Sequence, residues 1–241
     1  MLEQLLAALL YLFGFQTSGS IRGESTSSAV SSTSATTTTT SAKPFTPNNI
    51  VSLEAKFLEK QATALSAWEA KRASFSASLK AIKDEKKKTL LETIQNRLAE
   101  INKNQTALLM RKLKRLNIGV EEMQKLAQAY EKEGKDLSAV TTSLSTANQA
   151  IADAISSVTT QAGKTYVISI TSETNAKNDV GKVRVQLSSD LKKVRDAVAN
   201  ARKKVGEALK ALKNATGKPV TIFIPIETTG NSQTPTVTPT P

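Results

Sequence analysis

The chain has 241 residues, with 33 Lys and Arg against 21 Asp and Glu, a formal net charge of +12, and neither Cys nor His. The lack of Cys excludes disulfides, thiolate metal sites and a Cys nucleophile. The lack of His excludes a Ser-His-Asp triad and removes the commonest general base and metal ligand. Aromatic residues make up only 4% of the chain, which argues against a thick globular core, because aromatic side chains usually dominate core area.

The first segment, residues 1–16, is strongly apolar, with the sequence MLEQLLAALLYLFGFQ. It has the length of a signal-peptide hydrophobic region, since a membrane-spanning helix needs about 20 apolar residues. Small residues of the kind found at cleavage sites follow at 18–20, but the expected basic residue before the apolar run is absent. We therefore predict a signal-like or anchor segment, with three alternatives left open: a start that is misassigned, a short interfacial helix, or a helix docked on the rest of the chain.

Both ends of the chain contain low-complexity sequence. Residues 17–47 form a Ser/Thr-rich tract with little charge, and residues 219–241 end in a Thr/Pro-rich tail. Such segments cannot bury enough apolar area to fold, so we expect a flexible linker and an extended tail. An apolar segment, a Ser/Thr spacer, a folded body and a Thr/Pro tail is a layout typical of envelope proteins; the alternative is ordinary disordered termini.

The body, residues 48–218, contains no Pro and is predicted to be helical. Its glycines are possible joints between helices: Gly119, Gly134, Gly163, Gly181 and Gly206. Two regions show apolar residues spaced by three and four, as in a heptad seam. The first seam comprises Leu137, Val140, Leu144, Ala147, Ile151, Ala154 and Val158. The second comprises Leu187, Leu191, Val194, Val198, Ala201, Val205, Ala208 and Leu212. Asp136 is predicted to N-cap the first helix and Gly217 to C-cap the second.

Residues 50–118 carry a rougher apolar stripe in two phases. The first seam comprises Leu58, Leu65, Trp68, Phe75, Leu79 and Ile82, and the second Leu91, Ile94, Leu98, Ile101 and Leu108. The charged run 83–88 lies where the phase changes, so it is either a solvated stretch of one helix or a break between two. Residues 120–133, between two glycines, predict a separate shorter helix.

Two short runs are rich in β-branched and aromatic residues, at 166–170 and 220–226. If the helix between them is continuous, the two runs lie at its opposite ends and cannot pair. The first run is either a strand or part of a helix, and Pro225 demotes the second to an edge strand or an extended tail.

Amphipathic helices joined by short turns bury their apolar stripes against one another. The sequence therefore predicts an all-α fold, an elongated antiparallel helical bundle or coiled coil with disordered termini. The seams are suited equally to packing within the chain and to self-association with another copy.

Two stretches, Asn96–Thr106 (NRLAEINKNQT) and Gln161–Tyr166 (QAGKTY), are similar to stretches in predicted secreted helical proteins of small-genome, candidate-phylum bacteria. That group has no assigned activity, and the resemblance implies only an exported helical protein. It gives no functional residues to carry over.

No catalytic pattern stands out, and we expect no enzyme activity, no cofactor and no metal. The adjacent carboxylates Asp84/Glu85 and Glu121/Glu122 do not face each other on a helix. The sequence Gly163-Lys164-Thr165 has the ending of a phosphate-binding loop without its first Gly, and fits a helix-ending turn. The polar residues Asn102, Asn104, Gln105 and Thr106 form either a buried polar layer that fixes helix register or, as we favour, an exposed polar face.

The remaining signal is clustered positive charge, which attracts polyanions such as anionic lipids, acidic envelope polymers or nucleic acid. The candidate residues are Lys86, Lys87, Lys88, Arg111, Lys112, Lys114, Arg115, Lys192, Lys193, Arg195, Arg202, Lys203 and Lys204. The simpler interpretation is a solvated face that keeps the protein soluble. Sequence-specific nucleic-acid binding is not expected, because no aromatic residues for base stacking are interleaved with the basic clusters and the sequence has no recognised reading motif.

These observations predict an exported or membrane-anchored, non-enzymatic helical protein of the cell envelope, secreted or extracytoplasmic, with a structural, scaffold or adhesive role. The alternative is an intracellular, cytoplasmic coiled-coil protein that binds nucleic acid non-specifically through its basic clusters.

Overall fold

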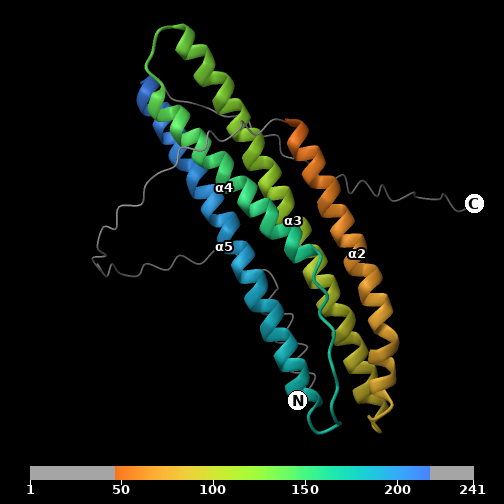
Figure 1. The fold of residues 1–241 in the computed structure, drawn as a ribbon. Coiled ribbons are helices and arrows are strands. Elements are labelled where there is room, and N and C mark those ends of the chain that lie inside the picture. The colour runs from red at the N-terminus through yellow and green to blue at the C-terminus, as the bar shows by residue number, and fades with distance from the viewer. Residues whose placement is uncertain (1–46, 218–241) are drawn as a thin grey trace, which may run out of the picture.

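The computed structural model describes residues 47–217, which form a bundle of four α-helices (Figure 1). The helices are α2 (Pro47–Leu79), α3 (Glu85–Lys132), α4 (Ser138–Ala162) and α5 (Ala176–Thr216). These described residues contain no β-strand, which confirms the predicted all-α bundle. The predictions for residues 1–46 and 218–241, including the β-prone run 220–226, lie outside the described residues.

Successive helices run in opposite directions along an elongated bundle, so that α3 and α5 are parallel (Figure 1). The 48 residues of α3 span about 72 Å at 1.5 Å per residue. Helices α3, α4 and α5 pack on one another, and α2 packs across α3 and α4. Helix α4 is much shorter than α3 and α5, and residues 163–175 continue its path in extended form to the start of α5 (Figure 1).

The charged run 83–88 is a break between two helices. The Asp84 carboxylate N-caps α3, accepting hydrogen bonds from the backbone N–H groups of Lys86 (2.9 Å) and Lys87 (3.3 Å). At the other end of the bundle, Gly217 adopts a φ of 66° and donates to the Lys213 carbonyl oxygen, so the predicted C-cap of α5 is confirmed. Asp136 accepts from the Ser138 N–H (3.0 Å), although the helix boundary itself falls at Leu137.

Three of the five glycines predicted as joints lie inside helices instead. Gly119 is in the interior of α3, while Gly181 and Gly206 are in α5. The segment 120–133 is therefore part of α3, and the prediction of a separate short helix is wrong. A glycine costs about 1 kcal/mol relative to Ala in a helix interior, and burial of the continuous apolar stripe on both sides outweighs that cost.

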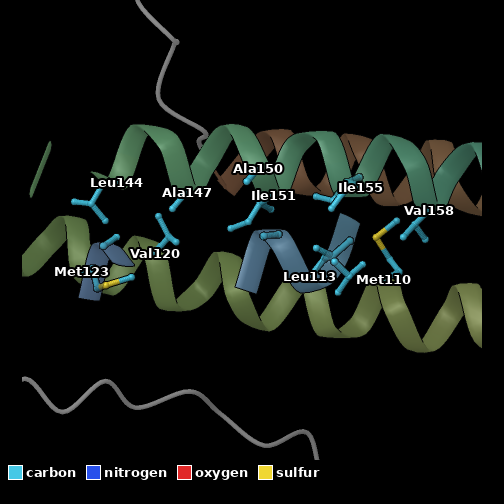
Figure 2. Packing of buried hydrophobic residues seen from close by; sticks show 14 of the residues in the cluster. Met110, Leu113, Val120, Met123, Leu144, Ala147, Ala150, Ile151, Ile155 and Val158 are labelled. Carbon is cyan, nitrogen blue, oxygen red and sulfur yellow. The ribbon is translucent and has the colours of Figure 1, made fainter. Parts of the chain in front are cut away.

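The seams predicted for 137–158 and 187–212 are confirmed, because all their residues are buried except Val205, which is partly buried. The seam residues other than Leu187 and Leu191 form an upper core with α3, in which Met110 and Leu113 lie opposite Ile155 and Val158 of α4, and Met123 lies opposite Leu144 (Figure 2). A second, lower core contains the C-terminal end of α2, the start of α3, residues 166–170 and the first half of α5, including Leu187 and Leu191.

The seam predicted for the first half of α2 is wrong. Leu58 and Leu65 are 57% and 53% exposed, and the neighbouring Phe57 enters the core in place of Leu58. A shift of one residue rotates a helix face by 100°, so the apolar stripe of α2 turns away from the bundle in this half. In α3, Leu108 is 40% exposed while Leu109 and Met110 are buried, for the same reason.

The run at 166–170 is neither strand nor helix. It is an extended segment whose backbone forms hydrogen bonds with a glutamine side chain. Tyr166, Ile168 and Ile170 alternate into the lower core, which is the period of two expected of β-branched sequence. The Gln95 side chain of α3 donates to the Tyr166 carbonyl oxygen and accepts from the Ile168 N–H, both at 2.8 Å. One glutamine thus replaces the neighbouring strand that a β-prone segment normally requires.

We expect Ile151→Ala to lower the free energy of unfolding by about 2–5 kcal/mol, because it leaves a cavity at a fully buried position between three helices. Urea denaturation followed by circular dichroism measures this loss. The matched control is Val185→Ala on α5, whose side chain is 67% exposed and whose change should stay within about 0.5 kcal/mol. Equal losses in the two variants would contradict the core assignment.

Candidate functional site

The thirteen basic candidate residues lie on two helices. Lys86, Lys87 and Lys88 are in the first turn of α3, whereas the cluster at 111–115 is in its middle, and the clusters at 192–195 and 202–204 are on α5. None of the thirteen side chains is buried. All four clusters are therefore on the surface of the bundle, as expected for charged groups.

Six of the thirteen lysines and arginines are paired with carboxylates. The pairs are Lys87–Glu173 (2.8 Å), Lys88–Glu85 (2.6 Å), Lys114–Glu54 (2.9 Å), Lys192–Asp196 (2.7 Å), Lys193–Asp190 (4.0 Å) and Lys204–Glu207 (2.8 Å). Four of these pairs are local, three or four residues apart on one helix, and such exposed pairs contribute little to stability. The positive charge of these six lysines is nevertheless neutralised by their carboxylate partners.

Seven basic candidates form no ion pair with any residue of the described range 47–217. We call them the unpaired basic set: Lys86, Arg111, Lys112, Arg115, Arg195, Arg202 and Lys203. Lys112 is 27 residues beyond the start of α3, and Lys203 is 27 residues beyond the start of α5. Because α3 and α5 run parallel from the same end of the bundle (Figure 1), these members of the set lie at a similar level.

A buried polar layer crosses the bundle where α4 ends. The Asn102 amide donates to the carbonyl oxygens of Gln161 and Lys164, both at 3.1 Å. The Gln161 amide in turn donates to Asn102 Oδ1 (2.9 Å) and to the Tyr166 hydroxyl (2.7 Å), which donates to Asp190 Oδ2 (2.9 Å). Asn102 and Thr106 are buried, so the favoured prediction of an exposed polar face is wrong for these two residues.

The polar layer ends in a charged group that stays ionised. Burial opposes ionisation of Asp190, but hydrogen bonds from Lys164 (3.0 Å) and Tyr166 outweigh it and lower the pKa of this carboxyl. The pKa of Tyr166 is raised, chiefly by burial, so its hydroxyl remains a donor at neutral pH. The layer therefore joins α3, α4, residues 164–166 and α5 through one ordered chain of donors and acceptors.

A further carboxylate, that of Glu173, fixes the lower end of residues 163–175. Glu173 accepts from the Lys83 N–H (3.0 Å) and pairs with Lys87, which ties this segment to the turn between α2 and α3. Hydrogen bonding from Lys87 lowers the pKa of Glu173 and raises that of Lys87. Lys87, a predicted polyanion-binding residue, thus has a structural partner.

The sequence features considered for catalysis have structural roles in the fold. Gly163 ends α4, as the turn interpretation predicts, and Lys164 pairs with Asp190 (3.0 Å). Asp84 caps α3, while Glu122 pairs with Lys125 (2.7 Å). Within residues 47–217, no group of three or more potential metal-ligating side chains comes together. None of the described helices has the long apolar stretch that crossing a membrane requires.

The structure also contains a hollow that the sequence analysis missed. A groove of about 530 Å³ lies between α2 and α3, with the end of α4 and residues 164–166 as its floor. Its apolar walls include Leu58 and Leu65, the two leucines that the sequence places in a core seam. We call it the α2–α3 groove. One sequence signal could have indicated this groove: the apolar seams of α2 and α3 are out of phase with each other.

Comparison with known proteins finds no matching family model, no similar curated protein and no similar solved structure. The resemblance to secreted helical proteins thus stays a prediction.

We expect acid to weaken the fold partly through Asp179, at the start of α5. Its carboxylate accepts from the Thr171 N–H (3.0 Å) and hydroxyl (2.8 Å), and these hydrogen bonds lower its pKa below the ordinary 3.8. Since the folded pKa is the lower one, the stabilisation is present above pH 3.8 and is lost as the pH falls through the folded pKa. Asp179→Asn should therefore make the acid-induced fall in unfolding free energy shallower.

Urea titrations at a series of pH values measure this slope. Thr171→Val removes one of the two donors and keeps the carboxylate, so its slope should fall between those of the wild-type protein and Asp179→Asn. A slope in Asp179→Asn equal to that of the wild type would show that this carboxylate does not couple to folding.

Proposed function

We propose that the protein is an exported or membrane-anchored, non-enzymatic component of the cell envelope, a helical spacer or scaffold that contacts anionic polymers or lipid headgroups. The export part of the proposal is supported by the apolar segment 1–16 and the Ser/Thr-rich tract that follows it. The scaffold part is supported by the elongated four-helix body.

The observation that carries the contact with polyanions is the unpaired basic set. Arg111, Lys112 and Arg115 lie within five residues on α3, and Arg202 and Lys203 lie at a similar level on α5. A rigid surface with uncompensated cations attracts any polyanion electrostatically, without requiring a shaped pocket. Near an anionic membrane, each such residue contributes about 1 kcal/mol of binding.

Location in the cell tests the export part. We expect fractionation of native cells to place the protein in the envelope or the medium, with a mature N-terminus near Ser20 or an embedded segment 1–16. Mass spectrometry of the N-terminus distinguishes these two forms. A full-length chain from Met1 in the cytoplasmic fraction would contradict export and favour the intracellular alternative.

The triple variant Arg111→Gln, Lys112→Gln and Arg115→Gln tests the basic contact. It should weaken binding to phosphatidylglycerol-containing vesicles by up to about 3 kcal/mol, roughly a hundredfold, at about 1 kcal/mol per residue. Vesicle co-sedimentation measures the change. Because the interaction is electrostatic, the binding of the wild-type chain should also weaken as salt is raised.

The matched control removes the same charge from paired lysines, in the triple variant Lys125→Gln, Lys192→Gln and Lys204→Gln. Each of these lysines has a carboxylate partner within 2.8 Å, so its loss should affect vesicle binding much less. Equal loss in both triple variants would mean that only net charge matters. Tight binding to a short DNA duplex without vesicle binding would support the nucleic-acid alternative.

A further inference from the structure

The α2–α3 groove has the size and lining of a small-molecule site. Its volume of about 530 Å³ falls within the range of about 300–1,000 Å³ that ligand pockets show. Leu58, Leu65 and Trp68 of α2 face it from one side and Ala99 of α3 from the other. The hollow is thus bounded by two helices and closed below by a third segment, with an apolar surface where a ligand would lie.

The apolar lining is not explained by packing within the described chain. Leu58 and Leu65 are one heptad apart on α2 and more than half exposed, whereas most other large apolar side chains of the bundle are buried. Opposite them, α3 presents Ala99 together with the polar side chains of Asn96, Glu100, Asn102 and Lys103. The small side chain of Ala99 leaves room for a narrow hydrocarbon chain beside the two leucines of α2.

The charged residues of the lining leave one positive charge uncompensated. Glu100 pairs with Arg97 (2.9 Å), and Lys164 pairs with Asp190 (3.0 Å). The ammonium group of Lys103 forms no ion pair with any residue of the range 47–217. An apolar groove with a single free cation on its wall complements a ligand that has one anionic group and an apolar body.

We propose that the α2–α3 groove binds a single-chain carboxylate amphiphile, a medium- to long-chain fatty acid. The hydrocarbon chain lies along Leu58, Leu65 and Trp68, and the carboxylate lies next to Lys103. The shape and charge of the groove carry this proposal, and it does not depend on where in the cell the protein acts. It is also separate from the unpaired basic set, because Lys103 is not one of those residues.

The sequence supplies a reporter for the test, because Trp68 is the only tryptophan of the chain and it lines the groove. Decanoate, dodecanoate and tetradecanoate, each titrated below its micelle concentration into the full chain, should shift Trp68 emission to shorter wavelength in a saturable manner. Bromine-labelled 12-bromododecanoate should quench it. Each pair of added methylenes should tighten binding by about tenfold while the chain stays within the groove.

Two variants test the two ends of the ligand. Leu65→Gln should weaken binding of all three fatty acids by about tenfold or more, because it places an amide on the apolar wall. Lys103→Gln should weaken dodecanoate but leave 1-dodecanol, a neutral alcohol of the same length, unchanged. The matched controls are Val185→Gln, at an exposed apolar position on α5, and Lys210→Gln, at an exposed position of α5 outside the groove and the unpaired basic set, and both should bind as the wild type does.

Three results would overturn the proposal. The first is Trp68 emission that does not respond to fatty acid, or responds without saturation. The second is equal weakening in Leu65→Gln and Val185→Gln. The third is a dimer, measured by sedimentation, that Leu65→Gln dissociates while fatty acid has no effect, since a second copy would then cover the groove. Dodecanol binding as tight as dodecanoate binding would remove the role assigned to Lys103.

Discussion

The fold depends on hydrogen bonds from side chains to the backbone of residues 163–175. A segment that leaves a helix and runs through a core must satisfy its N–H and C=O groups in some other way. Gln95 satisfies two of these groups, one at Tyr166 and one at Ile168, and Asn102 takes up the Lys164 carbonyl oxygen. These contacts let the chain travel from the end of α4 to the start of α5 without leaving the bundle, so α5 can return along its full length.

The same change from helix to extended chain creates the groove. Along the length of α4, its side chains pack against α3 and α5, and together they fill the upper core. After Ala162, the place of α4 in the bundle is taken by the extended residues 163–175, and an extended chain is thinner than a helix. The groove floor consists of this transition, from Ala162 to Tyr166. Both the buried polar layer and the apolar groove therefore result from the end of α4 at Ala162.

The surface charge of the bundle divides into compensated and uncompensated groups. Lys88 and Lys192 each pair with a carboxylate three or four residues away on their own helix. Arg111, Lys112 and Arg115 have no such neighbour in a pairing position, so their charge faces solvent. The proposed contact with polyanions follows from this local spacing, whereas the proposed fatty-acid site follows from how the helices are spaced.

The sequence by itself determined the all-α class, the seams of α4 and of α5, the C-cap at Gly217 and the position of the basic clusters. These features depend on periodicity and on residues close together in the chain, which local sequence records. Tertiary structure alone decided that Gly119, Gly181 and Gly206 lie within helices, that the backbone of Tyr166 and Ile168 bonds to Gln95, and that Leu58 and Leu65 face a groove. Each of these outcomes depends on contacts between residues far apart in sequence, and a phase shift of one residue changes which face is buried. A pattern read along one helix cannot supply that phase, because the partner helices set it.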